Sequence, residues 1–219
     1  MNTGKRLISA AKTAFIPVMI LWIVHLIKVL GNFQWGNWGI FPRDIKGLYG
    51  IFLAPWIHGD FSHLLSNSVP LFFLTTLILF FYQRVAITSF ILLYLLTGAL
   101  VWVFARPVYH IGASGVVYSM VSFVFWNGIF RRNMKSVVLA LVVMIMYSGY
   151  FAGIVPGEKG ISWESHLLGA ISGIVVSFMM KNYIESDEVE VDPWKDDDYT
   201  PKDYFLDRDA FDRPKNLRD

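Results

Sequence analysis

The chain has 219 residues, of which 55% are hydrophobic and 16% charged, and its mean hydropathy is +0.48. A soluble domain carries roughly 25% charged residues, so this composition excludes an ordinary soluble protein and indicates a membrane protein. The sequence has no cysteine, which excludes a disulfide scaffold, a thiolate metal site and a cysteine nucleophile.

The net charge of +2 is unevenly distributed along the chain. Residues 185–219 carry 13 acids and 6 bases, a balance of −7, whereas residues 1–184 carry 4 acids and 13 bases, a balance of +9. We therefore predict a membrane domain over residues 1–184 and an acidic, flexible cytoplasmic tail over residues 185–219. Because the bases of the first part stand singly between apolar runs, we expect a lipid bilayer and no nucleic acid as its partner.

Six apolar stretches are long enough, or nearly so, to cross a bilayer. They are residues 14–30, 64–82, 85–104, 114–130, 137–155 and 166–180. Since the hydrocarbon offers the backbone no water to bond to, each span must be a helix. The sequence thus predicts an all-α polytopic membrane protein with six transmembrane helices, whose first span stays as an anchor instead of being cleaved as a signal peptide.

Lysines and arginines predict the orientation of these spans, because they gather on the cytoplasmic side. One set of connecting segments carries eight: Lys5, Arg6, Lys12, Arg84, Arg131, Arg132, Lys135 and Lys181. The other set carries four: Arg43, Lys46, Arg106 and Lys159. Both termini should therefore be cytoplasmic, and the second, fourth and sixth spans should begin near the outer face.

The connecting segments carry weaker indications. The aromatic-rich segment 31–62 should lie in the outer interface. The segment 156–162 contains two glycines and a proline and should be mobile. We expect His25 to be a packed polar residue and Lys28 to extend outward to the membrane surface.

The outer end of the fourth span begins with Gly112-Ala113-Ser114-Gly115. Flanking glycines give a serine nucleophile room and unusual torsions, and a helix N-terminus favours developing negative charge. The pattern alone is weak, because glycine and serine also serve to pack helices closely in membranes. Ser114 is therefore a candidate nucleophile that needs a base nearby.

His166 begins the sixth span and is followed by Gly169 and Gly173. Such a stripe of small residues lets two helix backbones approach closely. If the sixth span packs on the fourth, His166 reaches Ser114 and can act as its base. The alternative is a satisfied polar histidine with no catalytic part.

Three further side chains share this depth. His63 and Asn67 lie one turn apart on one face of the second span and can donate hydrogen bonds to an oxyanion, together with the Ser114 N–H. Alternatively, they form a pair that holds the helix to the bundle. Tyr118, four residues after Ser114, projects from the same helix face, where its ring can stack beneath His166 or simply pack.

The first 184 residues contain only four acids: Asp44, Asp60, Glu158 and Glu164, all expected in loops. No span carries paired aspartates, and no His-Glu-x-x-His motif occurs. We therefore expect a Ser–His dyad with no acid behind His166, and neither metal nor cofactor.

Taken together, these residues resemble the rhomboid intramembrane serine proteases of the basic six-helix, bacterial type. The resemblance covers residues 45–181 and rests on three motifs: His58-x4-His63-x3-Asn67, Gly112-Ala113-Ser114-Gly115-Val116-Val117-Tyr118 and His166-x2-Gly169-x3-Gly173. It implies a serine endopeptidase of the cell's inner membrane that cleaves transmembrane proteins near the outer end of their spans, without cofactor. It also implies a nucleophile at Ser114, a base at His166, oxyanion donors at His63 and Asn67, and Tyr118 under the histidine.

One position departs from the family. Many members carry a Trp-Arg pair at a fixed distance before the His-x3-Asn motif, where this chain has Tyr49-Gly50. Two alternative functions remain open at this point: a catalytically inactive relative that binds membrane proteins, and a small transporter. Against the transporter, the polar cluster stops near one face and no internal repeat is visible.

Overall fold

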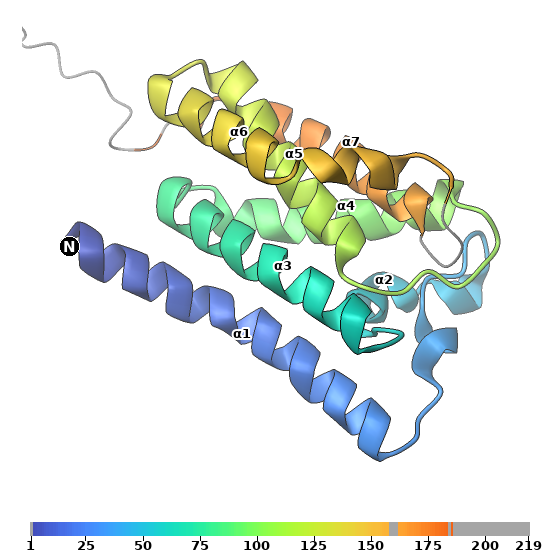
Figure 1. Ribbon diagram of the computed structural model, residues 1–219. Helices are drawn as coiled ribbons and strands as arrows, with labels where there is room; N and C mark the ends of the chain where they lie inside the picture. Colours follow the sequence, from blue (N-terminus) through green and yellow to red (C-terminus); the bar gives the residue numbers. More distant parts are fainter. Residues whose placement is uncertain (1, 158–161, 184, 186–219) are drawn as a thin grey trace, which may run out of the picture. The chain divides into compact units, whose positions relative to one another are not determined.

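The computed structural model describes residues 2–157, 162–183 and 185. Its helices are α1 (Thr3–Leu30), α2 (Gly50–Leu53), α3 (Phe61–Phe81), α4 (Ala86–Phe104), α5 (Ser114–Arg131), α6 (Met134–Met146) and α7 (Trp163–Met180) (Figure 1). Short 3₁₀ segments are η1 (Trp35–Trp38), η2 (Ile45–Gly47), η3 (Ala54–Trp56) and η4 (Ser148–Ile154). The expected acidic tail beyond Glu185 and most of the segment 156–162 lie outside the described residues.

The described residues form no β-strand, and the predicted all-α membrane bundle is confirmed. Helices α1, α3, α4 and α7 are each long and apolar enough to cross a membrane, and α6 with η4 adds a bent fifth candidate. α5 is the sixth long helix. Its interior carries serines, an asparagine and a tyrosine, and the surrounding helices bury most of it. The sequence is thus least apolar where the protein itself replaces lipid as the surroundings.

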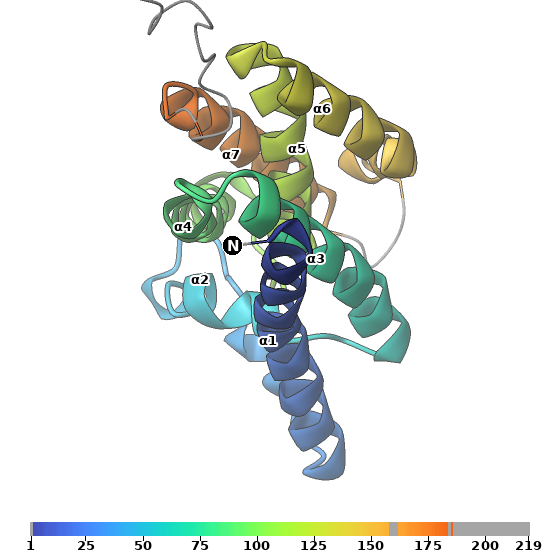
Figure 2. The same cartoon turned by 90° about the vertical axis from the view of Figure 1, so that its left-hand side faces the viewer.

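α5 lies between α6 and α7 and packs on both (Figure 2). Close approach depends on glycines of α7: a Cβ at Gly169 would collide with the Gly115 carbonyl oxygen, and one at Gly173 would lie 2.4 Å from the Ser119 carbonyl oxygen. The predicted packing of the sixth span on the fourth is therefore confirmed, with backbone against backbone.

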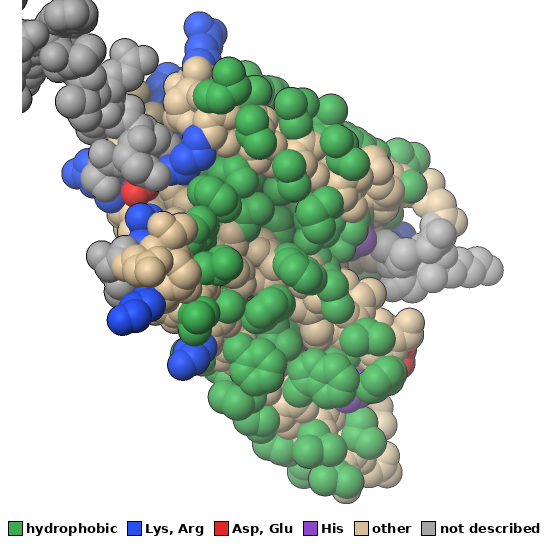
Figure 3. All heavy atoms as spheres, turned by 60° about the vertical axis from the view of Figure 1, so that its left-hand side comes forward, with side chains coloured by type: hydrophobic (Ala, Val, Ile, Leu, Met, Phe, Trp, Pro, Cys, Tyr) green, Lys and Arg blue, Asp and Glu red, His purple; other side chains and the backbone are tan. Residues whose placement is uncertain are grey.

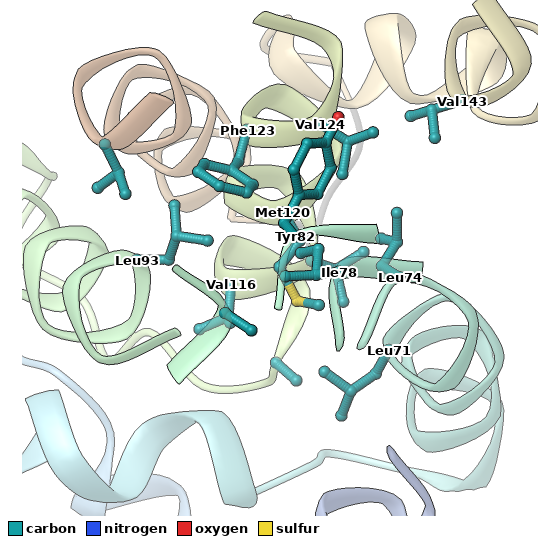
Figure 4. Close-up of a cluster of buried hydrophobic side chains, with 14 of the residues drawn as sticks. Leu71, Leu74, Ile78, Tyr82, Leu93, Val116, Met120, Phe123, Val124 and Val143 are labelled. Carbon is teal, nitrogen blue, oxygen red and sulfur yellow. The ribbon is translucent and has the colours of Figure 1, made fainter. Parts of the chain in front are cut away.

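A second layer of contacts joins α5 to α3 and α4 through a buried apolar cluster (Figure 4). Its fully buried side chains include Leu74 and Ile78 of α3, Leu93 of α4, and Met120 and Phe123 of α5. These residues come from three helices, and the same cluster includes Val176 of α7, so the core fixes α3, α4, α5 and α7 relative to one another.

Two predicted spans have wrong boundaries. α1 begins at Thr3, well before residue 14, because Asn2 caps it by accepting the Gly4 N–H; the hydropathy pattern marked only its apolar part. The predicted span 137–155 is not one helix. It stops at Met146 and continues as η4, bent by 66°.

The outer segment before α3 is fastened to α4 and α5. The Arg43 guanidinium donates to the carbonyls of Val103 and Ala105 at the end of α4, at 3.1 and 2.8 Å. Ile40 pairs with His110 through two backbone hydrogen bonds of 2.9 Å. Gly50, where many family members have arginine, lies so close to Gly39 that a Cβ there would clash with its backbone. The packing of this segment thus leaves no room for a side chain at position 50.

Most lysine and arginine side chains lie toward one end of this helical part, and the histidines lie toward the other. In Figure 3, lysines and arginines gather at the end where α1 begins, while histidines lie toward the other end. Glu185 lies beyond the last helix and is buried: its carboxylate accepts the Arg84 backbone N–H at 3.1 and 3.2 Å.

Candidate active site

Ser114 is the first residue of α5, and the backbone before it is held tightly. Gly112 has φ +100°, a conformation that a side chain disfavours, and its N–H donates to the Ala54 carbonyl at 2.9 Å. Ala113 donates its N–H to Nε2 of His58 at 3.4 Å. Two bonds to the segment before α3 thus fix the approach to the serine, whose own side chain is half-buried.

His166 lies in the first turns of α7 and is 8% exposed. Its ring stacks on Tyr118 with centroids 4.1 Å apart and planes 7° from parallel, which confirms the expected position of Tyr118. Its Nδ1 lies 2.8 Å from the Gly153 carbonyl oxygen. Because a carbonyl oxygen only accepts, Nδ1 must carry the proton, and Nε2 of the neutral ring then has a free lone pair.

The Ser–His pair is brought together by helix packing. His166 is one turn before Gly169, which touches the Gly115 backbone, and Tyr118 is one turn after Ser114. Among the residues that the structure describes, the Ser114 hydroxyl and the His166 ring form no hydrogen bond. Catalytic hydrogen bonds are often long in free enzymes and shorten when substrate binds.

His63 and Asn67 lie beside the loop that leads to Ser114. The Asn67 amide nitrogen donates to the main-chain carbonyl of His63, one turn earlier in α3, at 3.0 Å. A Cβ at Gly112 would lie 2.6 Å from Nε2 of His63 and 3.8 Å from Nδ2 of Asn67. The absence of a side chain at Gly112 therefore lets the His63 ring pack directly against the loop that leads to Ser114.

The segment before α3 has a further polar arrangement, around His58. The Lys28 ammonium donates to the carbonyls of His58 and Gly59 at 2.7 and 2.9 Å. The loop that precedes α3 thus holds the Lys28 ammonium, and the extension of Lys28 to the membrane surface stays a prediction. Burial, together with the neighbouring His63, lowers the pKa of His58 to about 4, so His58 is neutral and can accept the Ala113 N–H.

His110 and two serines form a chain of hydrogen bonds, here called the relay, that the spacing of these residues in the sequence does not reveal. Nε2 of His110 donates to the Arg106 carbonyl at 3.0 Å, so its Nδ1 accepts from the Ser162 hydroxyl at 2.6 Å. The Ser165 hydroxyl then donates to Ser162 at 2.6 Å. Burial lowers the pKa of His110, which favours this neutral arrangement. Since Ser162 caps α7, the relay anchors the helix that carries His166.

Glu164 lies in the first turn of α7 and is buried, not in a loop as expected. It pairs with the Arg106 Nε at 2.8 Å. Within the described ranges, no group of three or more His, Asp or Glu side chains is arranged to hold a metal ion.

Comparison with known proteins gives the family. The model of the Rhomboid domain matches residues 46–183. A Mycobacterium tuberculosis (strain ATCC 25618 / H37Rv) protein and a Mycobacterium bovis protein are each 31% identical over 172 residues, covering 74% of this chain and 72% of theirs. A Mycobacterium leprae (strain TN) protein is 31% identical over 174 residues, covering 74% of this chain and 67% of its own. All three are described as uncharacterized.

This chain belongs to the rhomboid family, and the predicted resemblance is confirmed. Family membership and the apolar helices indicate an integral membrane protein. Membership suggests an intramembrane serine protease, and the family also includes inactive members.

Proposed function

We propose that this protein is an intramembrane serine endopeptidase in which Ser114 is the nucleophile and His166 the general base. The observation that carries the proposal is the hydrogen bond from Nδ1 of His166 to the Gly153 carbonyl at 2.8 Å. It selects the tautomer whose Nε2 accepts a proton, as a base for serine requires. A backbone carbonyl takes the orienting place that an aspartate holds in a triad.

The reaction follows from these positions. The Ser114 oxygen attacks the scissile carbonyl carbon while its proton passes to Nε2 of His166. The oxyanion is stabilised by donors from His63, Asn67 and the Ser114 N–H. His166 then gives the proton to the leaving amine, and a water molecule, activated in the same way, hydrolyses the acyl ester of Ser114.

A lateral groove offers a route for a transmembrane substrate. It measures about 520 Å³ between α3 and the α6–η4 bend, with Val69 and Phe73 on one side and Met146, Tyr147 and Tyr150 on the other. Tyr150 also touches the site, because its carbonyl accepts the Tyr118 hydroxyl at 2.9 Å. A substrate segment in this groove would lie beside the stacked Tyr118 and His166 rings.

The proposed orientation places both termini in the cytoplasm of the cell and the site near the outer face. It rests on the excess of eight lysines and arginines over four between the two sets of connecting segments. In a bacterial cell, this arrangement corresponds to the inner membrane. The substrates would be membrane proteins whose spans emerge on the outer side.

The test uses the purified protein in liposomes with a fluorescent single-span substrate and a fluorophosphonate label. Ser114→Ala and His166→Ala should each abolish cleavage and labelling, while Ser9→Ala, a serine on the exposed face of α1, should retain both. Cleavage by Ser114→Ala would refute the proposal. Absence of cleavage and labelling in the unsubstituted protein would instead favour the inactive, substrate-binding relative.

A further inference from the structure

A second, apolar crevice lies on the opposite side of α3 from the substrate groove. It has a volume of about 290 Å³ and lies between Pro17 and Leu21 of α1 and Ile87 and Phe90 of α4. Val116 and Met120 of α5 form its floor, and Leu71 of α3 also lines it. Its walls thus come from four membrane helices.

The dimensions of the crevice suit one lipid tail. Along α1 it extends from Thr13 to Leu21, which is about 12 Å at 1.5 Å per residue. The hydrocarbon of one leaflet is about half of 30 Å thick. A nearly wholly apolar slot of this length, open toward the bilayer, matches an acyl chain that lies parallel to the helices.

The two ends of the crevice differ. Near the candidate active site it is closed by Pro55 and Trp56 of η3. At the other end, Leu79 precedes Phe80, whose carbonyl accepts from the Arg6 guanidinium at 3.5 Å. Lys12 lies next to Thr13 and is exposed. Arg6 and Lys12 do not line the crevice, but they are the basic side chains of α1 that a headgroup at this end can reach.

We propose that this crevice binds one acyl chain of an anionic phospholipid from the leaflet at the basic end, and that its occupancy supports the active site. Ala113 lines the crevice directly before Ser114, and Trp56 lies two residues before His58. The Ala113 N–H and His58 form the bond that holds the approach to Ser114. A chain in the crevice packs against both sides of this bond and restrains it.

The lipid site and the proposed protease can be tested separately. Ile87→Trp places a large ring at the mouth of the crevice, and Ile91→Trp, one turn further on α4, is the matched control because Ile91 is exposed and does not line the crevice. Native mass spectrometry after exchange into mixed phosphatidylglycerol and phosphatidylcholine counts the lipids retained. The unsubstituted protein and Ile91→Trp should retain one phosphatidylglycerol that Ile87→Trp lacks.

If Ile87→Trp retains as much lipid as Ile91→Trp, the lipid site is refuted. If the unsubstituted protein retains phosphatidylcholine as well as phosphatidylglycerol, the preference for an anionic headgroup is refuted. Fluorophosphonate labelling of Ser114 should be several-fold slower in Ile87→Trp, and labelling equal to Ile91→Trp would overturn the link to the active site. That second arm rests on the proposed function. If the unsubstituted protein takes no label, the protease has failed, while lipid counting still decides the binding site.

Discussion

Acidification should destabilise the fold through His58. This side chain is fully buried, and burial with the nearby His63 lowers its pKa from 6.5 to about 4. The geometry gives the reason: Nε2 accepts the Ala113 N–H, so a proton on Nε2 would place two donors against each other. Between pH 6.5 and about 4, His58 therefore stays neutral in the folded protein but is protonated in the unfolded chain.

The size of the effect follows from proton linkage. Above pH 6.5 both states leave His58 neutral, and the full stability is present. Between pH 6.5 and about 4 the unfolded state binds up to one more proton, so the free energy of unfolding falls by as much as 1.4 kcal/mol per pH unit. The total is about 3 kcal/mol, and below the folded pKa no further loss comes from this group.

His58→Gln is the matched variant, because its side-chain oxygen can accept the Ala113 N–H without titrating. Reversible unfolding in mixed micelles is measured for both proteins from pH 7.5 to 4.5. The unsubstituted protein should lose roughly 2 to 3 kcal/mol more than the variant. Other groups, including the buried His110, are common to both proteins and cancel. Parallel curves would refute the reasoning.

Three further predictions concern the candidate site. Gly153→Ala should lower kcat roughly 10²-fold, because its Cβ would lie 3.1 Å from Nδ1 of His166 and against the Tyr118 hydroxyl. Gly149→Ala is the control, since the space around Gly149 is open, and it should leave kcat unchanged. An equal loss of kcat in both variants would contradict the reasoning. Asn67→Ala should lower kcat about 10²–10³-fold through loss of an oxyanion donor; a raised KM at constant kcat would assign Asn67 to substrate binding instead. Ser162→Ala should lower the unfolding free energy by about 1 kcal/mol, since it removes the cap of α7 and the partner of His110; an unchanged Tm would show that the relay adds no stability.

The sequence by itself determined the class of fold and the candidate residues. Apolar length marks a membrane helix wherever it occurs, and charge bias and motif order are equally local properties. Gly169 and Gly173 even predicted the packing of α7 on α5, because a stripe of small residues has few other uses at membrane depth. The sequence alone could therefore predict that Ser114, Tyr118 and His166 belong to one site.

Only the tertiary structure decided how the site is held. Three contacts that hold it use backbone atoms, which no pattern of side chains reveals. They join the Gly153 carbonyl to His166, the Ala113 N–H to His58, and Lys28 to the His58 carbonyl. The relay of His110 with Ser162 joins residues 52 positions apart. The bend after Met146 escaped prediction because an apolar run looks the same whether its helix continues or turns. Hydropathy measures affinity for lipid, whereas these features depend on which polar atoms meet once the helices have packed.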